Sequence, residues 1–443
     1  MRKGQDDTHL ASSLQYTETI TAHLGQTGVA MIQEFSLTNI LSIKERQTLS
    51  FEVALKESEP SCHWVEMPDR TRLLRMACIY GANASGKTNI LQAYNLFMDF
   101  LLNGFATLKP DDPIPVIPFQ FDPDTPQEPS SFELKFYLDG HRYIYAITMT
   151  RWQIISESLY WFETKQKKLV YRREANGEIA WGASITGNKK QIDTMTKQNI
   201  PLLTMGTKLD HPLFARVYQC LDQLTTSLIT RGSDPLKQEL LKQIEENPDN
   251  KSALLQFLDN ASFTTIEDII VGATDLPQKF LSMSQSVGVK TPGAKHRTAQ
   301  VVHRFNGRTY SLPIGKESEG VQRCMELALP LLDAIHHERM LLIDEIGSSL
   351  HEELLAYFID TFLEGGSYSQ LVFTTQCLDL LDSELLRDDE VWFASKNAQG
   401  STELNCITDY VGIPKGVSRK KLYQAGTFGA MPLFKGMVSK LDS

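Results

Sequence analysis

Residues 81–88 read Gly-Ala-Asn-Ala-Ser-Gly-Lys-Thr, and this stretch restricts the fold of the chain more than any other feature. It fits the pattern G-x-x-x-x-G-K-[ST] of a phosphate-binding loop, or P-loop. Small residues let backbone N–H groups curl around an anion, and a helix that begins near Lys87 adds the partial positive charge of its first turn. Lys87 is expected to reach the β- and γ-phosphates, and Thr88 to ligate Mg²⁺. The predicted nucleotide-binding residues of this segment are Gly81, Asn83, Ala84, Ser85, Gly86, Lys87, Thr88 and Asn89.

The segments on either side of the loop are the ones that a P-loop requires. The apolar run at 73–80 predicts a buried strand, and residues 88–102 carry apolar side chains at helical spacing. Strand, glycine-rich loop and helix in this order are typical of an α/β fold that binds nucleotide. A chance turn between a strand and a helix is the alternative for the loop taken alone.

Composition argues against several other classes of protein. The chain has 443 residues, 42% of them hydrophobic, which is ordinary for a protein of two or three domains. Its net charge of −10 argues against a dedicated nucleic-acid coat but leaves a local DNA contact open. No apolar run reaches the length of a membrane span, and the first 30 residues lack the apolar core of a signal peptide. The six cysteines have no C-x-x-C spacing, so we expect reduced thiols in a cytoplasmic protein.

The pattern of apolar, polar and charged residues predicts how the chain divides into four segments. Residues 131–162 alternate apolar and polar side chains around Asp139-Gly140, a strong hairpin signal, and the aromatics there favour packing over a base-stacking platform. Residues 205–275 have helical spacing. Residues 286–304 predict a solvated loop, and the alternative is that its basic residues Lys290, Lys295, Arg297 and Arg304 contact phosphate or a partner. The expected division is a polar extension at 1–30, a nucleotide-binding lobe with the P-loop and a β-meander at 31–175, an inserted helical lobe at 176–300 and a second part of the nucleotide-binding lobe at 301–443.

A second motif lies far downstream, between Arg339 and His351. Four apolar residues, 340–343, predict a buried strand that ends at Asp344 and Glu345, which is the Walker B arrangement. Asp344 is expected to hold Mg²⁺ through water, and Glu345 to orient or deprotonate the attacking water. An acidic corner between a strand and a helix is the simpler interpretation of this segment alone, but the upstream P-loop favours a phosphoryl-transfer site.

A polar helix start precedes that strand. Ser318, Glu319 and Gly320 open a segment with apolar residues at helical spacing, and Ser318 occupies the N-cap position. Outward N–H groups at such a start bind anions well. An ordinary capped helix is the alternative, and the position just before Walker B favours an anion-binding role.

These motifs occur in the order found in ABC-type ATPases. "SEGVQR" at 318–323 resembles the Ser-[DE]-Gly-x-x-Arg signature of the OLD/RloA-like ATPases of bacteria, which occur in abortive-infection and other phage-defence systems. "MIQEFSLTNILSIKERQTLSF" looks like that family's first strand pair, which implies that Asn39 and Ser42 lie near the adenine. The resemblance covers residues 31–434 and is weakest across 175–285. It implies an α/β, ABC-ATPase-type P-loop fold with a β-rich lobe and an inserted helical lobe.

The chain departs from that family at two positions. Where the family usually has a histidine that senses the γ-phosphate, at the end of the strand "QLVFTT", this chain has Gln376. Glutamine can donate a hydrogen bond but carries no ionisable imidazole, so we expect nucleotide binding with slow hydrolysis. The usual acidic residue two places after the glutamate is Gly347, which alters the loop expected at the dimer interface.

The resemblance also implies how the site works. ATP with Mg²⁺ lies between two head-to-tail protomers, with Lys87, Thr88, Asp344 and Glu345 from one and Ser318, Glu319 and Gly320 from the other. The catalytic residues would be Glu345, Lys87 and Gln376. Such a homodimer, or a higher homo-oligomer, acts as an ATP-driven switch. The implied partners are a second copy of the chain, a separately encoded nuclease or toxin effector and a phage protein as trigger, and the resemblance implies no membrane partner.

Other functions fit less well. An SMC-like DNA repair or chromosome ATPase would have long coiled-coil arms, and no such heptad run is present. A self-contained OLD-type nuclease needs a C-terminal TOPRIM domain, for which the residues after Gln376 are too few. A transporter subunit is disfavoured by the variant signature.

Overall fold

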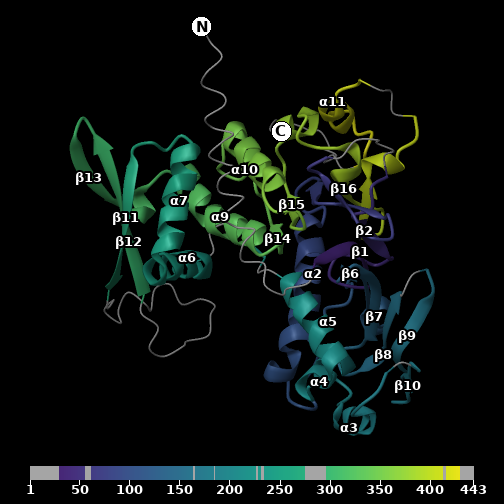
Figure 1. Cartoon of the computed structure of the whole chain (residues 1–443). Helices are drawn as coiled ribbons and strands as arrows, with labels where there is room; N and C mark the ends of the chain where they lie inside the picture. The colour runs from purple at the N-terminus through teal and green to yellow at the C-terminus, as the bar shows by residue number, and fades with distance from the viewer. Residues whose placement is uncertain are drawn as a thin grey trace, which may run out of the picture. The chain divides into compact units, whose positions relative to one another are not determined.

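The computed structural model describes residues 29–54, 61–162, 165–183, 185–225, 228–230, 234–274, 296–412 and 416–429. The chain divides into two compact units, which are treated separately below (Figure 1). The first unit comprises Met1–Leu228, Ala334–Asp344 and Asp360–Ser443, and the second comprises Ile229–Asp333 and Glu345–Ile359. Most of the expected N-terminal extension lies outside the described residues, as does the end of the C-terminal segment.

A seven-stranded antiparallel sheet forms one layer of the first unit, in the order β10-β9-β8-β7-β6-β1-β2. Its strands are β1 (Ala30–Thr38), β2 (Gln47–Ser50), β6 (Ser130–Leu138), β7 (His141–Met149), β8 (Ile154–Phe162), β9 (Lys167–Arg173) and β10 (Ile179–Trp181). The predicted hairpin at Asp139 and Gly140 is confirmed, and both residues have the positive φ, 52° and 77°, that a two-residue turn between twisted strands requires. Buried residues alternate along β7, so one face of the sheet lies on the core.

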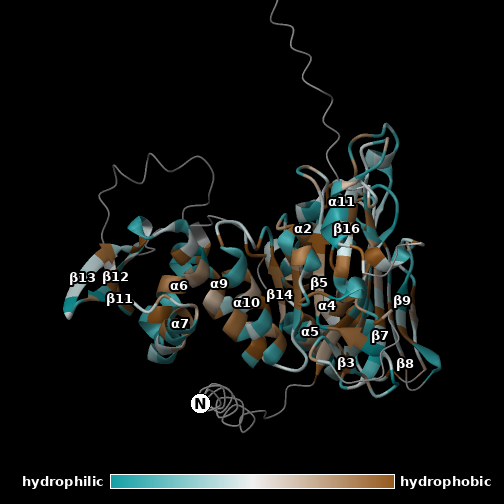
Figure 2. Ribbon diagram, turned by 90° about the horizontal axis from the view of Figure 1, so that it is seen from above, coloured by the Kyte–Doolittle hydropathy of each residue, from teal (hydrophilic) through white to brown (hydrophobic). Residues whose placement is uncertain are grey.

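The first unit contains a second, largely parallel sheet of five strands, and this sheet positions the P-loop and Asp344. Its order is β14-β15-β5-β16-β17, with the first four strands parallel and β17 antiparallel. The strands are β5 (Met76–Tyr80), β14 (Met340–Ile343), β15 (Gln370–Thr374), β16 (Val391–Lys396) and β17 (Thr402–Cys406). Every residue of β5 and β14 is buried, and both strands are brown in the hydropathy colouring of Figure 2. Continuous apolar runs of this kind are expected where a parallel sheet is covered on both faces.

The predicted strand at 73–80 is two strands in the structure. β4 (Arg72–Leu74) pairs with β3 (Trp64–Glu66), and β5 begins only at Met76. Arg75 separates them, because its buried guanidinium donates hydrogen bonds to backbone carbonyls at the end of α10 (Glu352–Glu364). The apolar pattern alone could not reveal this break.

The helix after the P-loop packs between the sheets of the first unit. α2 (Lys87–Thr107) is longer than the predicted 88–102. Its Tyr94 and Phe97 rings lie 5.1 and 5.8 Å from the ring of Phe35 on β1, and Ile90 and Leu91 belong to the same buried cluster. Three shorter helices also belong to this unit: α3 (Lys189–Met195), α4 (Leu202–Lys208) and α5 (Pro212–Gln223). α4 and α5 pack against α2.

The second unit combines helices with a small sheet. Its three strands are β11 (Ile266–Thr274), β12 (His296–Phe305) and β13 (Arg308–Pro313). The helices wholly or partly within it are α6 (Asp234–Glu246), α7 (Pro248–Asn260), α9 (Glu319–His336) and α10. α6 packs against β12 and α7 against β11.

This unit differs from the inserted helical lobe expected at 176–300. Helices α3–α5 belong to the first unit, and the second unit runs on to Asp333. Residues 296–304, expected in a loop, belong to strand β12, because Ala299 and Val301 are buried there and pair with β11. Arg297 and Arg304 form ion pairs with Glu245 and Glu267. The rest of the expected loop, 286–295, lies outside the described residues.

The short elements are η2 (Thr125–Gln127), η3 (Ile314–Lys316), η4 (Asp379–Asp382), η5 (Asp388–Glu390), η6 (Ile407–Asp409) and α11 (Arg419–Gln424). None of the helices in the described part of the chain is both long and apolar enough to cross a membrane.

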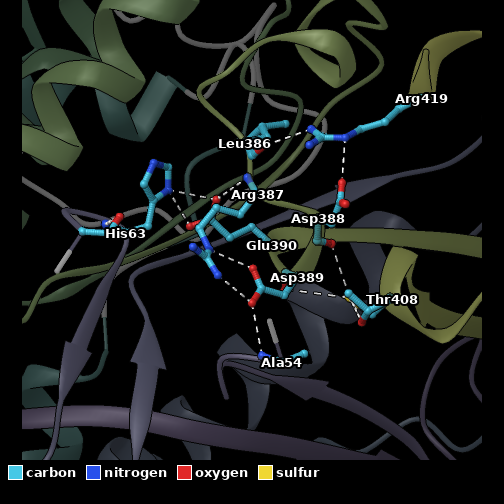
Figure 3. Close-up of polar contacts among 11 residues, drawn as sticks. Ala54, His63, Leu386, Arg387, Asp388, Asp389, Glu390, Thr408 and Arg419 are labelled. Atoms are coloured by element: carbon cyan, nitrogen blue, oxygen red, sulfur yellow. Dashed lines mark hydrogen bonds and ion pairs between the residues drawn. The ribbon is translucent and has the colours of Figure 1, made fainter. Parts of the chain in front are cut away.

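The acidic turn η5 anchors the start of β16 (Figure 3). Glu390 accepts a hydrogen bond from His63 at 2.9 Å, and Asp389 accepts from Arg387 and from the backbone N–H of Ala54. Asp388 pairs with Arg419 of α11 at 2.7 Å. Burial raises the pKa of the Glu390 carboxyl, and the His63 contact opposes that rise. These contacts set the position of the β16–β17 hairpin, whose second strand reaches the P-loop.

Candidate nucleotide-binding site

The P-loop of the first unit connects β5 to α2, as the motif predicts. Residues 81–86 form the loop, and the helix begins at Lys87. Gly86 has φ 102°, a left-handed conformation that side chains disfavour. A Cβ at Gly86 would collide with the hydroxyl of Thr402, and one at Gly81 would collide with the backbone oxygen of Ala394. Glycine is therefore required at both positions by close packing.

Two polar groups inside the loop suit a phosphate. Lys87 is buried, and its Nζ donates hydrogen bonds to the carbonyls of Gly81 and Ala82 at 2.7 and 3.1 Å. The hydroxyl of Ser85 is also buried and has no hydrogen-bond partner among the described residues. A buried hydroxyl without a partner is unfavourable, and a phosphate oxygen would satisfy it. Lys87 and Ser85 thus fit an anion held by the loop.

A carboxylate and two hydroxyls form the candidate metal site. Asp344 follows β14, and it accepts hydrogen bonds from Thr88 at 2.9 Å and from Thr374 at 2.6 Å. Hydroxyl and carboxylate oxygens are the ligands that Mg²⁺ prefers. Thr88 and Asp344, predicted from sequence as the metal residues, therefore lie in contact. Thr374 was not predicted, although its position at the end of β15, beside β14, marks the same edge of the sheet.

Gln376 lies at the P-loop. Its side-chain amide donates a hydrogen bond to the side-chain oxygen of Asn83 at 2.8 Å. Gln376 is exposed and follows β15 by two residues, so it comes from the strand next to β5. The structure thus brings together two predicted residues that are 293 positions apart in the sequence.

The predicted signature residues lie in the second unit. Ser318 caps α9 by accepting a hydrogen bond from the N–H of Val321 at 3.3 Å. Glu319 accepts one from the hydroxyl of Ser349 at 2.8 Å, and a Cβ at Gly320 would lie 3.1 Å from the backbone oxygen of Ser349. The helix start therefore packs on the loop that follows Walker B.

The loop after Asp344 has an unusual backbone. Glu345 and Ser349 have φ angles of 50° and 66°, in the left-handed region that non-glycine residues rarely adopt. The N–H of Ser348 closes a turn onto the carbonyl of Glu345 at 3.0 Å. Non-glycine residues held in this region concentrate at functional sites, which is consistent with the predicted role of Glu345.

A contact from the sheet of the second unit also supports the start of α9. His303 of β12 lies 2.9 Å from the carboxylate of Glu317, the residue before Ser318. The side-chain amide of Gln322 donates to the carbonyl of Glu317 at 2.8 Å. Sequence analysis missed this pair, because nothing in either segment indicates that β12 lies beside the helix start.

Asn39, predicted to bind nucleotide, lies in the loop between β1 and β2. Its side chain is buried, donates to the carbonyls of Thr125 and Glu128 at 2.8 and 3.0 Å, and accepts from the N–H of Phe119 at 2.9 Å. These bonds use both ends of the amide, and the expected place of Asn39 in a loop near the adenine stays a prediction. Asn39 instead fixes the chain between Phe119 and Pro129.

Ser42 is the residue of the β1–β2 loop that approaches the P-loop. Its hydroxyl lies 2.8 Å from the hydroxyl of Thr402, which donates to the carbonyl of Ser85 at 2.9 Å. The β1–β2 loop and β17 therefore both flank the phosphate cradle.

Comparisons with known proteins identify the family to which the chain belongs. A search of curated proteins found no match. Among solved structures, the chain is similar to an SMC head domain from Thermotoga maritima, with a TM-score of 0.39 and 13% sequence identity over 85% of this chain and 98% of that one. An Smc head domain with an extended coiled coil, bound to the C-terminal domain of ScpA from Pyrococcus furiosus, has a TM-score of 0.38 and 13% identity over 89% and 98% of the two chains.

A family model matches residues 76–202 and 226–382, which together are more than half of the chain. The matched segments contain the P-loop, Asp344 and Gln376. The protein therefore belongs to the P-loop ATPase family described as "AAA domain, putative AbiEii toxin, Type IV TA system".

Proposed function

We propose that the chain binds and hydrolyses ATP with Mg²⁺, and that it serves as the sensor or scaffold of a bacterial abortive-infection system whose nuclease or toxin is a separate protein. The observation that carries the proposal is the contact between Thr88 and Asp344 beside a P-loop that holds a buried lysine. These are the groups that phosphoryl transfer needs in one place.

Each residue of the first unit has a definable task in nucleotide binding. Lys87 exchanges its two carbonyl partners for β- and γ-phosphate oxygens, and the Ser85 hydroxyl donates to a phosphate. The Thr88 hydroxyl and the Asp344 carboxylate hold the metal, while Thr374 keeps that carboxylate oriented. Bound Mg²⁺ supplies neutralisation of the phosphate charge.

Hydrolysis rests on Glu345 and Gln376. Glu345 follows the metal-holding Asp344 directly, so it is the carboxylate assigned to the attacking water. Gln376 donates through its amide to Asn83 of the loop, and the same amide can report on the γ-phosphate. Because it has no ionisable ring, we propose that turnover is slow.

The active assembly is proposed to be a head-to-tail homodimer. Ser318 is exposed at the start of an 18-residue helix, and N–H groups at such a helix start suit the phosphates of a second protomer. Nucleotide would join the two protomers, and hydrolysis or release would separate them.

The proposed biological role is supported by the family description and by the resemblance of the signature. The family description names a toxin of a type IV toxin–antitoxin system. We assign this chain the controlling role, in which a phage product disturbs the ATP-bound assembly and frees the effector. Moving an effector from about 1% to 99% free requires roughly 5.5 kcal/mol of differential binding between the two states.

Isothermal calorimetry with ATP and Mg²⁺ tests nucleotide binding. Lys87→Ala is expected to lose most of the affinity, because this ammonium is the cation that the P-loop motif places at the phosphates. Lys165→Ala, at an exposed lysine outside the site, is the matched control and should bind as the wild type does. Equal affinities for wild type and Lys87→Ala would show that the loop does not bind phosphate.

Infection assays test the biological role. Cells that carry the chain together with the neighbouring effector gene should restrict phage, while cells with either gene alone, or with Lys87→Ala, should not. Full protection by the effector alone would remove this chain from the controlling role. Growth arrest by the chain alone would identify it as the toxin itself.

A further inference from the structure

We infer that Tyr80 and residues 418–428 hold the turn that carries Gln376, and that they thereby set its contact with the γ-phosphate. Tyr80 and Arg419 are then positioning residues for ATP hydrolysis. The inference rests on the proposed function, because it concerns the γ-phosphate sensor of the same site. All of these residues belong to the first unit.

Gln376 lies on a turn between two elements. β15 ends at Thr374, and η4 begins at Asp379. Gln376 is exposed, and its amide donates to Asn83 of the P-loop at 2.8 Å. A side chain on such a turn keeps a productive position only where the backbone beside it is held. The contacts that fix this turn therefore decide where the amide lies.

Tyr80 holds the turn from the strand of the P-loop. It is the last residue of β5, directly before Gly81, and it is fully buried. Its hydroxyl donates a hydrogen bond at 3.1 Å to the carbonyl of Cys377, the residue after Gln376. Burial raises the pKa of this hydroxyl, so it keeps the proton that it donates. Tyr80 thus ties the backbone beside Gln376 to the start of the P-loop.

Arg419 holds the chain downstream of Gln376 (Figure 3). Its guanidinium donates hydrogen bonds to the carbonyls of Leu381 and Leu386 at 3.0 and 2.9 Å, and it pairs with Asp388 at 2.7 Å. One planar guanidinium can make these three contacts together, because its donors have a fixed arrangement. Arg419 therefore fixes the segment between η4 and η5 against α11.

The start of α11 makes a second set of contacts with η4. Ser418 caps the helix and donates its hydroxyl proton to the carboxylate of Asp382. The backbone N–H of Lys420 donates to the other oxygen of Asp382 at 3.1 Å, and the Lys420 ammonium pairs with Asp379. Because η4 begins three residues after Gln376, these contacts restrict the position of the turn.

Aromatic packing joins the same segment to Tyr80. Phe393 of β16 is the register partner of Tyr80, and their ring centroids are 6.2 Å apart. Phe428 stacks on Phe393 at 4.2 Å with planes at 8°, and the Tyr423 ring lies 6.4 Å from that of Tyr80. Both Phe428 and Tyr423 are buried. Residues 418–428 therefore contact both supports of the turn, η4 through polar groups and Tyr80 through rings.

Steady-state ATPase assays with the full chain and Mg²⁺ test the inference. Tyr80→Phe removes only the hydroxyl and is expected to lower kcat by up to about 100-fold, the effect of a small misplacement of a reacting group. Arg419→Met is the second variant and should also lower kcat. Tyr218→Phe is the matched control, because it removes a hydroxyl that donates to the backbone carbonyl of Leu102 at 2.6 Å, and it should keep the wild-type rate.

Two further measurements separate positioning from general support of the fold. In a Gln376→Ala background, Tyr80→Phe should have no additional effect on kcat, because the two residues act through one group. Calorimetry with ATP and with ADP, each with Mg²⁺, adds a measurement that needs no turnover. Tyr80→Phe should weaken ATP binding about 2- to 12-fold, the value of one hydrogen bond, and leave ADP binding unchanged.

Wild-type kcat together with wild-type ATP affinity in Tyr80→Phe would overturn the inference. An equal loss of kcat with and without Gln376 would do the same, because it would show a general defect of the site. Failure of the wild type to hydrolyse ATP would remove hydrolysis from the proposed function, and the ratio of ATP to ADP affinity would then decide the inference alone. In each case ATP binding by the wild type and its loss in Lys87→Ala would leave the proposed nucleotide site standing.

Discussion

Hydroxyl groups from a helix and a strand converge on the carboxylate of Asp344. Thr88 lies in the first turn of α2, and Thr374 is the last residue of β15; both donate hydrogen bonds to Asp344. The shorter bond, at 2.6 Å, comes from Thr374, so in the proposed metal site this residue would keep the carboxylate oriented. The P-loop motif identifies Thr88, whereas Thr374 is recognised only once β14 and β15 are seen to be neighbours.

The ion pair between Lys44 and Asp122 makes stability depend on pH. The Lys44 side chain and the backbone N–H groups of Asp124 and Thr125 lower the pKa of Asp122 to about 2. An acid with a lowered folded-state pKa stabilises the fold above its unfolded pKa, near 3.8, and loses that effect as pH falls through about 2. Asp122→Asn should therefore be less stable than the wild type at pH 7.

Urea unfolding of both proteins between pH 7 and pH 3 checks this. The difference in the free energy of unfolding should be constant above pH 5 and should shrink as the pH approaches 3. A difference that stays constant down to pH 3 would show that it does not come from the charge of Asp122.

At the scale of elements, Arg75 connects the P-loop strand to a helix. Its guanidinium donates to the carbonyls of Phe362 and Leu363 at 3.0 and 2.8 Å, to that of Gly366, and to that of Cys62 at 2.7 Å. The last carbonyls of a helix have no partner within it, and a cation there also interacts favourably with the helix dipole. Burial lowers the pKa of Arg75 to about 10, which leaves it charged at neutral pH.

Arg75→Met should destabilise the first unit by about 3 kcal/mol or more, because it leaves several buried carbonyls without a donor. The control is Arg72→Met, which removes a partly exposed pair with Glu66 and a contact over the Trp64 ring, and should cost no more than about 1 kcal/mol. Urea unfolding of the two variants and the wild type gives both values. Similar values for both would mean that the α10 carbonyls find other donors.

At the scale of the whole molecule, the Walker B residues Asp344 and Glu345 belong to different compact units. Asp344 ends a segment of the first unit, and Glu345 begins a segment of the second. The second unit also contains the signature residues, and Glu319 contacts Ser349 within it. In the proposed homodimer the signature residues Ser318, Glu319 and Gly320 face the nucleotide of the other protomer, so assembly should depend on ATP.

Glu345→Gln should bind ATP but fail to hydrolyse it, and therefore accumulate as a dimer. Analytical ultracentrifugation with ATP and Mg²⁺ measures this directly, and the dimer fraction should exceed that of the wild type. Glu353→Gln, at an exposed glutamate in the first turn of α10, is the control and should match the wild type. An ATP-independent sedimentation coefficient for Glu345→Gln would contradict the two-chain site.

The sequence by itself determined the P-loop, the strand and helix that flank it, the Asp139-Gly140 hairpin and the strand before Asp344. Each is encoded by neighbouring residues, through glycine spacing or apolar periodicity, so no distant contact is needed to recognise it. Tertiary structure alone decided the roles of Asn39, Arg75, Thr374 and Thr402. The bond from Thr402 to Ser85 joins residues 317 positions apart, and that from Asn39 to Thr125 joins residues 86 apart. A polar side chain takes its function from the partner that the fold brings to it, and local sequence does not specify that partner.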